Sequence, residues 1–312
     1  MSLELVKEIF QKIPDCESWS LHLLGFKHSK RNGTAYNCRK IELEPSSEMD
    51  QLLHNISNLY VGEDKNRLSK YVDIREYDGT CNGTTVYKIS EKNSNVEIDL
   101  EALFQGIAKS DTESDPLEMK AQAYILCSNI MINNEEHPLK LISISTPVTL
   151  LKNRFMHKNG KFWAIKKKVL HLHTNINVLI YDKTTYFLDM SGETLFNLER
   201  AYKLKCSEVV NEIETMSIVS DIEIFKSTAT TGANPRRFVA FSKSKLQMLK
   251  KKKNREKAAK YFNIPLTGED KRFDTTEKVD AENLVKLLCG KAMWDIMEEV
   301  PVEVDGSKSW TR

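Results

Sequence analysis

The sequence predicts an α+β protein in which an N-terminal α/β module is followed by a larger mixed or antiparallel sheet with C-terminal helices. Runs rich in β-branched and aromatic residues, separated by turn residues, fill most of positions 19–189. From Ser191 onward, apolar residues recur at helical spacing instead. The stretch 110–116 is polar and acidic and ends in proline, which is typical of a linker. We therefore predict two modules, residues 1–112 and residues 117–312.

The first module contains four expected strands and two expected helices. The strands are predicted at residues 19–26, 36–43, 71–77 and 84–89. Apolar residues at helical spacing predict helices over 49–60 and 100–107, the second capped by Asp99. Because Asp78-Gly79 and Asn82-Gly83 separate the last two strands, we expect these strands to form a hairpin with a longer loop.

The second module begins with a dense run of expected strands and ends in helices. The strands are predicted at 121–132, 139–145, 161–165, 169–173, 178–182 and 185–189. Their spacing is that of successive hairpins, which favours an antiparallel or mixed sheet. In the helical part we expect a break near Lys205, a helix start at Asn234-Pro235, and a last helix that runs from Asp280 to Gly290.

Charge is distributed unevenly along the 312 residues. The chain is 40% hydrophobic and 29% charged, which excludes a disordered or collagen-like protein, and its net charge is only +2. Residues 1–151 carry −7, residues 152–260 carry +13 and residues 261–312 carry −4. A strongly basic block between two acidic ones indicates a polyanionic partner for that block.

Several classes of protein are excluded by what the sequence lacks. The six cysteines are scattered and form no C-x-x-C pair, so neither a zinc knuckle nor a redox pair is expected. No apolar run approaches the roughly 18 residues that span a bilayer, and no nucleotide-binding or nucleophile-elbow motif is present. We therefore expect no cofactor, free thiols and a cytoplasmic location.

Two basic segments are the candidate nucleic-acid-binding sites. The first, residues 152–168, has a net charge of +7 and contains no acidic residue. It includes the tight turn Asn159-Gly160 and several aromatic residues. The second, residues 235–260, carries +10. The cations that we expect to contact phosphates are Lys152, Arg154, Lys158, Lys161, Lys166, Lys167, Lys168, Arg236, Arg237, Lys243, Lys245, Lys250, Lys251, Lys252, Lys253, Arg255 and Lys257.

The four consecutive lysines, Lys250 to Lys253, are the most informative feature of the second segment. If they lie within one helix, at about 100° per residue, they cover most of its circumference and cannot all avoid a core. That turn must then protrude or face an anion. Like charges at this spacing repel, and a bound polyanion would remove the repulsion. A solvated lysine-rich helix face is the simpler alternative.

Other residues of the chain indicate alternative functions, and these alternatives stay open. Asp221 and Glu223, with Lys226 nearby, would hold magnesium in a nuclease if the segment is extended, although the spacing departs from the usual nuclease pattern. The same residues also fit a helix capped by Asp221. His171 and His173 would share one face of a strand and could bind a metal with His157 or Asp182, or they could be ordinary hydrogen-bonded or exposed histidines. The small-residue loop 230–233 could approach a phosphate or serve only as a connector. A non-enzymatic adaptor that docks on an acidic protein or an anionic membrane is the third hypothesis.

The order of elements between residues 176 and 300 resembles a known family. A strand at Asn177–Tyr181 is followed by a second at Thr185–Asp189, a helix entry at Leu195-Phe196, a helical pair, and a long helix around Phe238–Phe241. This order resembles the KwaB-like subunit of the Kiwa anti-phage defence system. The resemblance implies a bacterial defence protein that binds DNA, associates with a transmembrane partner subunit (KwaA-like) at the inner membrane, and forms homo-oligomers such as a dimer. Catalysis of its own is not expected.

Overall fold

The computed structural model forms two compact units. Unit 1 comprises Met1–Glu76 and Gly83–Asn197, and unit 2 comprises Tyr77–Asn82 and Leu198–Arg312. The structure describes residues 2–29, 33–42, 47–63, 66–77, 79, 83–90, 98, 100–110, 119–150, 155–164, 168–241, 243–290, 292–295 and 300–303. The predicted linker therefore lies almost wholly outside the described residues.

Unit 1 is built on an eight-stranded sheet in the order β2-β1-β5-β6-β11-β12-β4-β3. The strands are β1 (Ser20–Ser29), β2 (Gly33–Ile41), β3 (Asp73–Glu76), β4 (Thr85–Ile89), β5 (Ala123–Ile132), β6 (Glu135–Ser143), β11 (Val178–Tyr181) and β12 (Thr184–Phe187). Neighbours are antiparallel except for β3 and β4, which are parallel. The predictions of an α+β protein and of a mixed sheet are confirmed.

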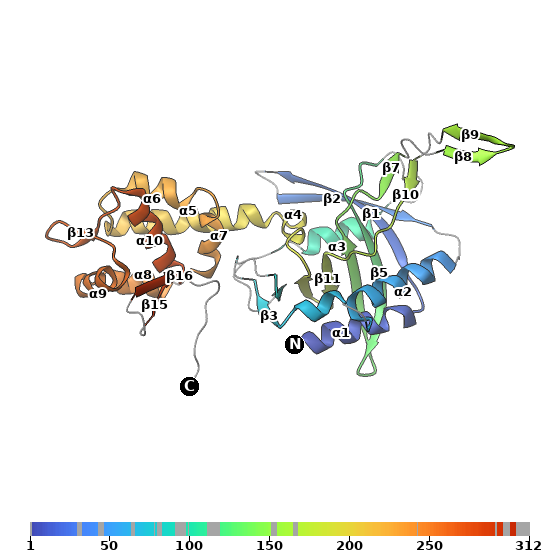
Figure 1. Ribbon diagram of the computed structural model, residues 1–312, viewed down its shortest axis with the longest axis horizontal. Coiled ribbons are helices and arrows are strands. Elements are labelled where there is room, and N and C mark those ends of the chain that lie inside the picture. Colours follow the sequence, from blue (N-terminus) through green and yellow to red (C-terminus); the bar gives the residue numbers. More distant parts are fainter. Residues whose placement is uncertain are drawn as a thin grey trace. The chain divides into compact units, whose positions relative to one another are not determined.

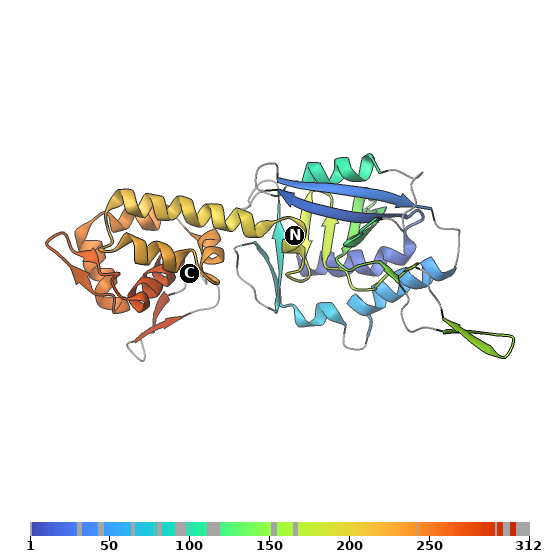
Figure 2. The same cartoon turned by 90° about the horizontal axis from the view of Figure 1, so that it is seen from above.

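Helices cover both faces of this sheet (Figure 1, Figure 2). On one face α1 (Leu3–Lys12) and α2 (Ser47–Val61) close the main core, where the rings of Phe10 and Tyr60 stack with centroids 4.2 Å apart. On the other, α3 (Leu100–Ala108) contacts β2 through Gly106. Shorter elements of the unit are η1 (Ile13–Asp15), η2 (Arg67–Lys70) and α4 (Gly192–Leu195).

The strand pair β3 and β4 differs from the predicted hairpin. The two strands run parallel, with Ile74 opposite Val86. Parallel neighbours require a crossover connection, and here six of the eight residues between the strands, Tyr77–Asn82, belong to unit 2. The predicted boundary between residues 112 and 117 also falls within unit 1, because β1 pairs with β5 and joins both predicted modules in one sheet.

Unit 2 is mainly helical. Its helices are α5 (Leu198–Met216), α6 (Ile222–Ala229), α7 (Asn234–Arg237), η4 (Phe238–Ala240), α8 (Lys243–Leu249), α9 (Lys252–Phe262) and α10 (Lys278–Leu288). Two short hairpins accompany them, β13 (Leu266–Thr267) with β14 (Arg272–Phe273), and β15 (Ala292–Asp295) with β16 (Val300–Glu303). Phe225, Phe238 and Phe273 are fully buried in its core.

Three helix predictions for unit 2 need correction. Helix α5 is continuous past Lys205, where a break was expected. The long helix expected around Phe238 is a single 3₁₀ turn, because the chain turns extended at Phe241. The last helix is capped at Glu277, three residues before the expected Asp280. None of the helices in the described part of the chain is long and apolar enough to cross a membrane.

Candidate nucleic-acid interface

The first basic segment lies in two small hairpins of unit 1. β7 (Val148–Leu150) pairs with β10 (Lys168–Leu170), and between them β8 (Phe155–Lys158) pairs with β9 (Lys161–Ala164). The predicted tight turn is confirmed, since Asn159 and Gly160 have φ values of 54° and 75°. Lys161 is exposed beside this turn. Lys152, Arg154, Lys166 and Lys167 lie outside the described residues.

The second segment lies entirely in unit 2. Arg236 and Arg237 are in α7, where the Arg237 guanidinium donates to Asn234 Oδ1 at 3.2 Å and Arg236 stands over the Tyr202 ring at 5.8 Å. Lys243 and Lys245 are in α8. The structure brings the remaining predicted cations together around the junction of α8 with α9.

The four consecutive lysines form this junction and not a continuous helix. The amide of Lys250 donates to Gln247 O, and that of Lys251 to Met248 O, each at 3.3 Å. Lys251 then has extended dihedrals (φ −81°, ψ 123°) as the N-cap of α9. The helical-circumference argument is therefore wrong, but all four side chains are exposed. We call Lys250–Lys253 the lysine turn.

The lysine turn places positive charge where a helix disfavours it. The first turn of α9 has Lys252 and Lys253 and no acid, and Lys251 provides no side-chain cap. Helix N-termini carry a partial positive charge, so cations there cost free energy. Lys257 and Lys260 continue the exposed basic surface along α9. None of the ion pairs found between described residues involves Lys250–Lys253, Lys257 or Lys260.

Arg255 was predicted to contact phosphates, and the structure corrects this prediction. It is 7% exposed, and its guanidinium donates to backbone carbonyls of Leu249, Lys250, Asp270 and Lys271. The last two residues belong to the β13–β14 turn, which sequence reasoning did not connect with the lysines. A signal existed, because Arg255 shares the spacing of Ala258, Ala259 and Phe262, which pack against the core.

Side-chain amides near the lysine turn are bonded to the protein itself. Gln247 Nε2 donates to Glu212 Oε1 at 3.0 Å, and Asn254 Nδ2 donates to Met248 O at 2.7 Å. Lys252 Nζ reaches the carbonyl of Glu269 at 2.7 Å. The groups that remain directed to solvent on this surface are therefore mainly ammonium groups.

The extended arrangement required by the nuclease alternative is not present. Asp221 is the N-cap of α6, and its Oδ1 accepts from the Ile224 amide at 2.9 Å, so the capped-helix alternative is confirmed. Glu223 lies in the first turn of the same helix. His171 and His173 lie after β10 and not in a strand, with ring centroids 4.2 Å apart. No group of three or more metal-ligating side chains occurs among the residues that the structure describes.

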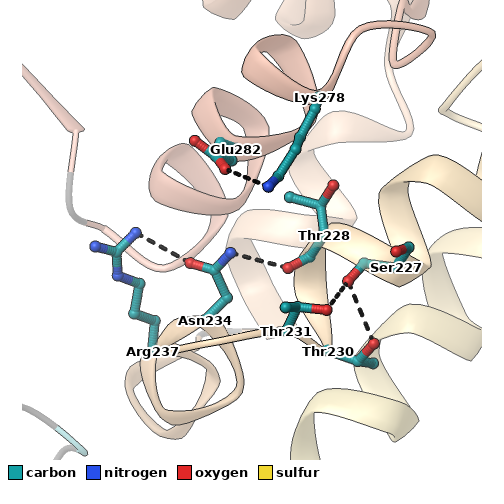
Figure 3. Close-up of polar contacts among 8 residues, drawn as sticks. All are labelled: Ser227, Thr228, Thr230, Thr231, Asn234, Arg237, Lys278 and Glu282. Atoms are coloured by element: carbon teal, nitrogen blue, oxygen red, sulfur yellow. Dashed lines mark hydrogen bonds and ion pairs between the residues drawn. The ribbon is translucent and has the colours of Figure 1, made fainter.

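The loop after α6 is closed by its own hydrogen bonds (Figure 3). The Thr230 hydroxyl donates to Lys226 O at 2.8 Å, and the Thr231 hydroxyl donates to Ser227 O at 2.6 Å. Asn234 Nδ2 donates to Thr228 O at 2.9 Å and joins the loop to α7. These bonds satisfy the last carbonyls of α6, so the loop has the role of a helix terminus.

The cysteines of the described residues are free thiols, as expected. Burial raises the pKa of Cys127 and of Cys206 to about 11. Thiols with a raised pKa are poor nucleophiles at neutral pH. They contribute to packing and offer no reactive thiolate.

Comparison with known proteins identifies the family. A family model described as Kiwa protein KwaB-like matches residues 120–293, which is more than half of the chain. The chain belongs to the KwaB-like family. Its role accordingly lies in Kiwa anti-phage defence. No curated protein and no solved structure matches it.

The match extends beyond the region in which the sequence resembled the family. It begins before β5 of unit 1 and ends in β15 of unit 2, so it contains the lysine turn, Arg255 and the β13–β14 turn. The KwaB-like region therefore includes strands of the sheet as well as the helical unit. The predicted resemblance is confirmed over a wider range.

Proposed function

We propose that this KwaB-like protein binds DNA through the lysine turn, with Lys257 and Lys260, without reading its sequence. The observation that carries the proposal is the concentration of exposed lysines at the start of α9, with no acid in that turn. Phosphates placed there would interact favourably with the lysines and with the N-terminal end of the helix. Release of counterions from DNA would add to the binding free energy.

The hydrogen bonds of side chains near the lysine turn support recognition of the DNA phosphate backbone and not of the bases. Arginine, asparagine and glutamine read bases through bidentate hydrogen bonds in the major groove. On this surface Arg255, Asn254 and Gln247 donate to groups of the protein instead. Lysine ammonium groups are compact charges that bind DNA phosphates whatever the base sequence. Similar affinity for duplexes of unrelated sequence is the expected consequence.

A charge-reversal variant tests the proposal. Replacing Lys250 to Lys253 by glutamate should abolish DNA binding near physiological salt. Each phosphate contact contributes about 0.9 to the slope of log K against log salt, so the slope should fall by up to about 3.6. Binding is measured on labelled duplex DNA over a salt series, with and without magnesium.

The matched control has the same change in net charge in unit 1. Lys27, Lys70, Lys109 and Lys120 are exposed there, and their replacement by glutamate should reduce affinity far less. Equal losses in the two variants would contradict a local interface. Magnesium-dependent loss of DNA would favour the nuclease, and retention only by anionic vesicles or an acidic protein would favour the adaptor.

Family membership supports proposals about partners. We propose that the chain acts in the cytoplasm with a transmembrane KwaA-like subunit and assembles as a homo-oligomer. Co-purification with that subunit and light scattering of the purified chain test the two associations separately. A monomer that does not co-purify would contradict both.

A further inference from the structure

Arg255 differs from every other lysine and arginine near it. Among the residues whose burial the structure describes, it is the only buried lysine or arginine. A charged group withdrawn from water is tolerated only when hydrogen bonds satisfy it. In this case the acceptors are backbone carbonyls.

The guanidinium joins two separate segments of unit 2. Its Nη1 donates to Leu249 O at 2.8 Å and to Lys250 O at 2.9 Å, where α8 ends. Its Nε donates to Lys271 O at 2.8 Å, and Nη2 donates to Asp270 O. A cation also interacts favourably with the negative end of the α8 dipole. One side chain therefore fixes the lysine turn against the β13–β14 turn.

Carbonyl acceptors have a consequence that carboxylates would not have. Neighbouring lysines repel one another and tend to spread the turn that carries them. A carboxylate would hold the turn but neutralise part of its charge. Carbonyls hold the backbone and leave the formal charge of the lysine turn intact. The hydrogen bonds of Lys252 to Glu269 O and of Asn254 to Met248 O also hold the turn without adding a negative charge.

We propose that Arg255 is the positioning residue of this interface, and this inference rests on the proposed DNA-binding function. Arg255 holds the backbone of Lys250–Lys253 in one conformation, so that several ammonium groups meet a phosphate backbone together. Lysine cannot replace it, because an ammonium group lacks the planar fork that reaches four carbonyls at once.

The test compares Arg255→Lys with Lys257→Gln in the full chain. Arg255→Lys keeps the net charge, yet amide exchange at 248–254 and 268–272 should become about tenfold faster, as lost hydrogen bonds lower local stability. The affinity for duplex DNA should fall, and the salt slope should decrease by at least about 0.9, the contribution of one phosphate contact. Lys257→Gln removes one exposed charge, so its slope should fall by about the same amount with exchange unchanged.

The readouts separate the two proposals. If wild-type protein does not bind duplex DNA at low salt, the proposed function fails, whatever the exchange data show. If wild-type protein binds but Arg255→Lys shows faster exchange with an unchanged slope, the positioning role is wrong. Unchanged exchange in Arg255→Lys overturns it as well.

A second variant applies if Arg255→Lys does not fold. Asn254→Ala removes the bond to Met248 O without a change of charge. It should give faster exchange in the lysine turn, a lower affinity for duplex DNA and a smaller salt slope than the wild-type protein. Faster exchange with wild-type affinity and slope would show that the conformation of the turn does not govern binding, and would overturn the proposal.

Discussion

Helices α1 and α9 have ten and eleven residues, and both end in a basic last turn, but their first turns differ in charge. α1 has Glu4 in its first turn and Lys12 in its last, and its lysines pair with Glu4 and Glu8 at 2.9 and 3.1 Å. This order agrees with the helix dipole. α9 begins with Lys252 and Lys253 and has no acid in its first turn. The charges of α1 therefore stabilise its own helix, whereas α9 has no negative charge at its start. In the proposed complex, DNA phosphates would supply that charge.

The largest effect is expected from giving α9 the charge order of α1. Lys251→Asp supplies an N-cap and a negative charge at the helix start, and should raise the free energy of unfolding by about 1 to 2 kcal/mol. The same change should weaken DNA binding if the proposed function is correct, because it reverses one charge of the lysine turn. Chemical denaturation and DNA titration measure the two effects on one preparation.

Lys257→Asp is the control, since it changes the same charge in the middle of α9 and provides no cap. It should weaken binding without stabilising the fold. A Lys251→Asp protein that is no more stable than wild type would contradict the electrostatic account of α9.

The reverse change removes a favourable helix start from α6. Asp221→Ala should lower the free energy of unfolding by about 1 kcal/mol, because the Ile224 amide loses its acceptor. DNA binding should be retained. A magnesium-dependent loss of DNA that disappears in this variant would instead assign Asp221 to a nuclease.

A smaller effect concerns the pH dependence of unit 1. Burial, together with Lys40 and Lys140, lowers the pKa of His22, whose ring nitrogens contact Ser110 Oγ at 3.1 Å and Ser20 Oγ at 3.2 Å. The unfolded chain therefore takes up a proton first as the pH falls below the ordinary value of 6.5. The free energy of unfolding should therefore decrease as the pH falls from about 6.5 to the lowered pKa of His22 in the folded protein.

Urea denaturation of wild type and His22→Asn at pH 7.5 and 5.5 measures this contribution. The loss of stability on acidification should be smaller in His22→Asn than in wild type. An equal loss in both proteins would assign the pH dependence to other groups.

Much of unit 1 could be predicted because runs rich in β-branched and aromatic residues, bounded by turn residues, are typical of strands. β1, β2, β5 and β6 lie close to their expected positions for this reason. The parallel pairing of β3 with β4 could not be predicted, because turn residues also occur where a chain leaves a sheet to join another unit. Local signals identify a strand but not its neighbour.

In unit 2 the basic character could be predicted from the sequence. Which of the basic residues are buried and which are exposed could not. Charge counts treat Arg255 and Lys253 alike, although one is buried against carbonyls and the other is exposed. The break between α8 and α9 was missed because lysine itself favours helix. The position of this break depends on the contacts of Arg255 with the β13–β14 turn, about 15 residues away along the chain.

The segment Tyr77–Asn82 has a consequence for synthesis of the protein. It belongs to unit 2, where Tyr77 is 1% exposed and a Cβ at Gly79 would lie 2.2 Å from Arg236 O. These residues leave the ribosome more than a hundred residues before Leu198, the start of the rest of that unit. A C-terminal fragment that begins at Leu198 therefore lacks residues that pack within unit 2. In a nascent chain, Gly79 must therefore remain accessible until Arg236 has emerged.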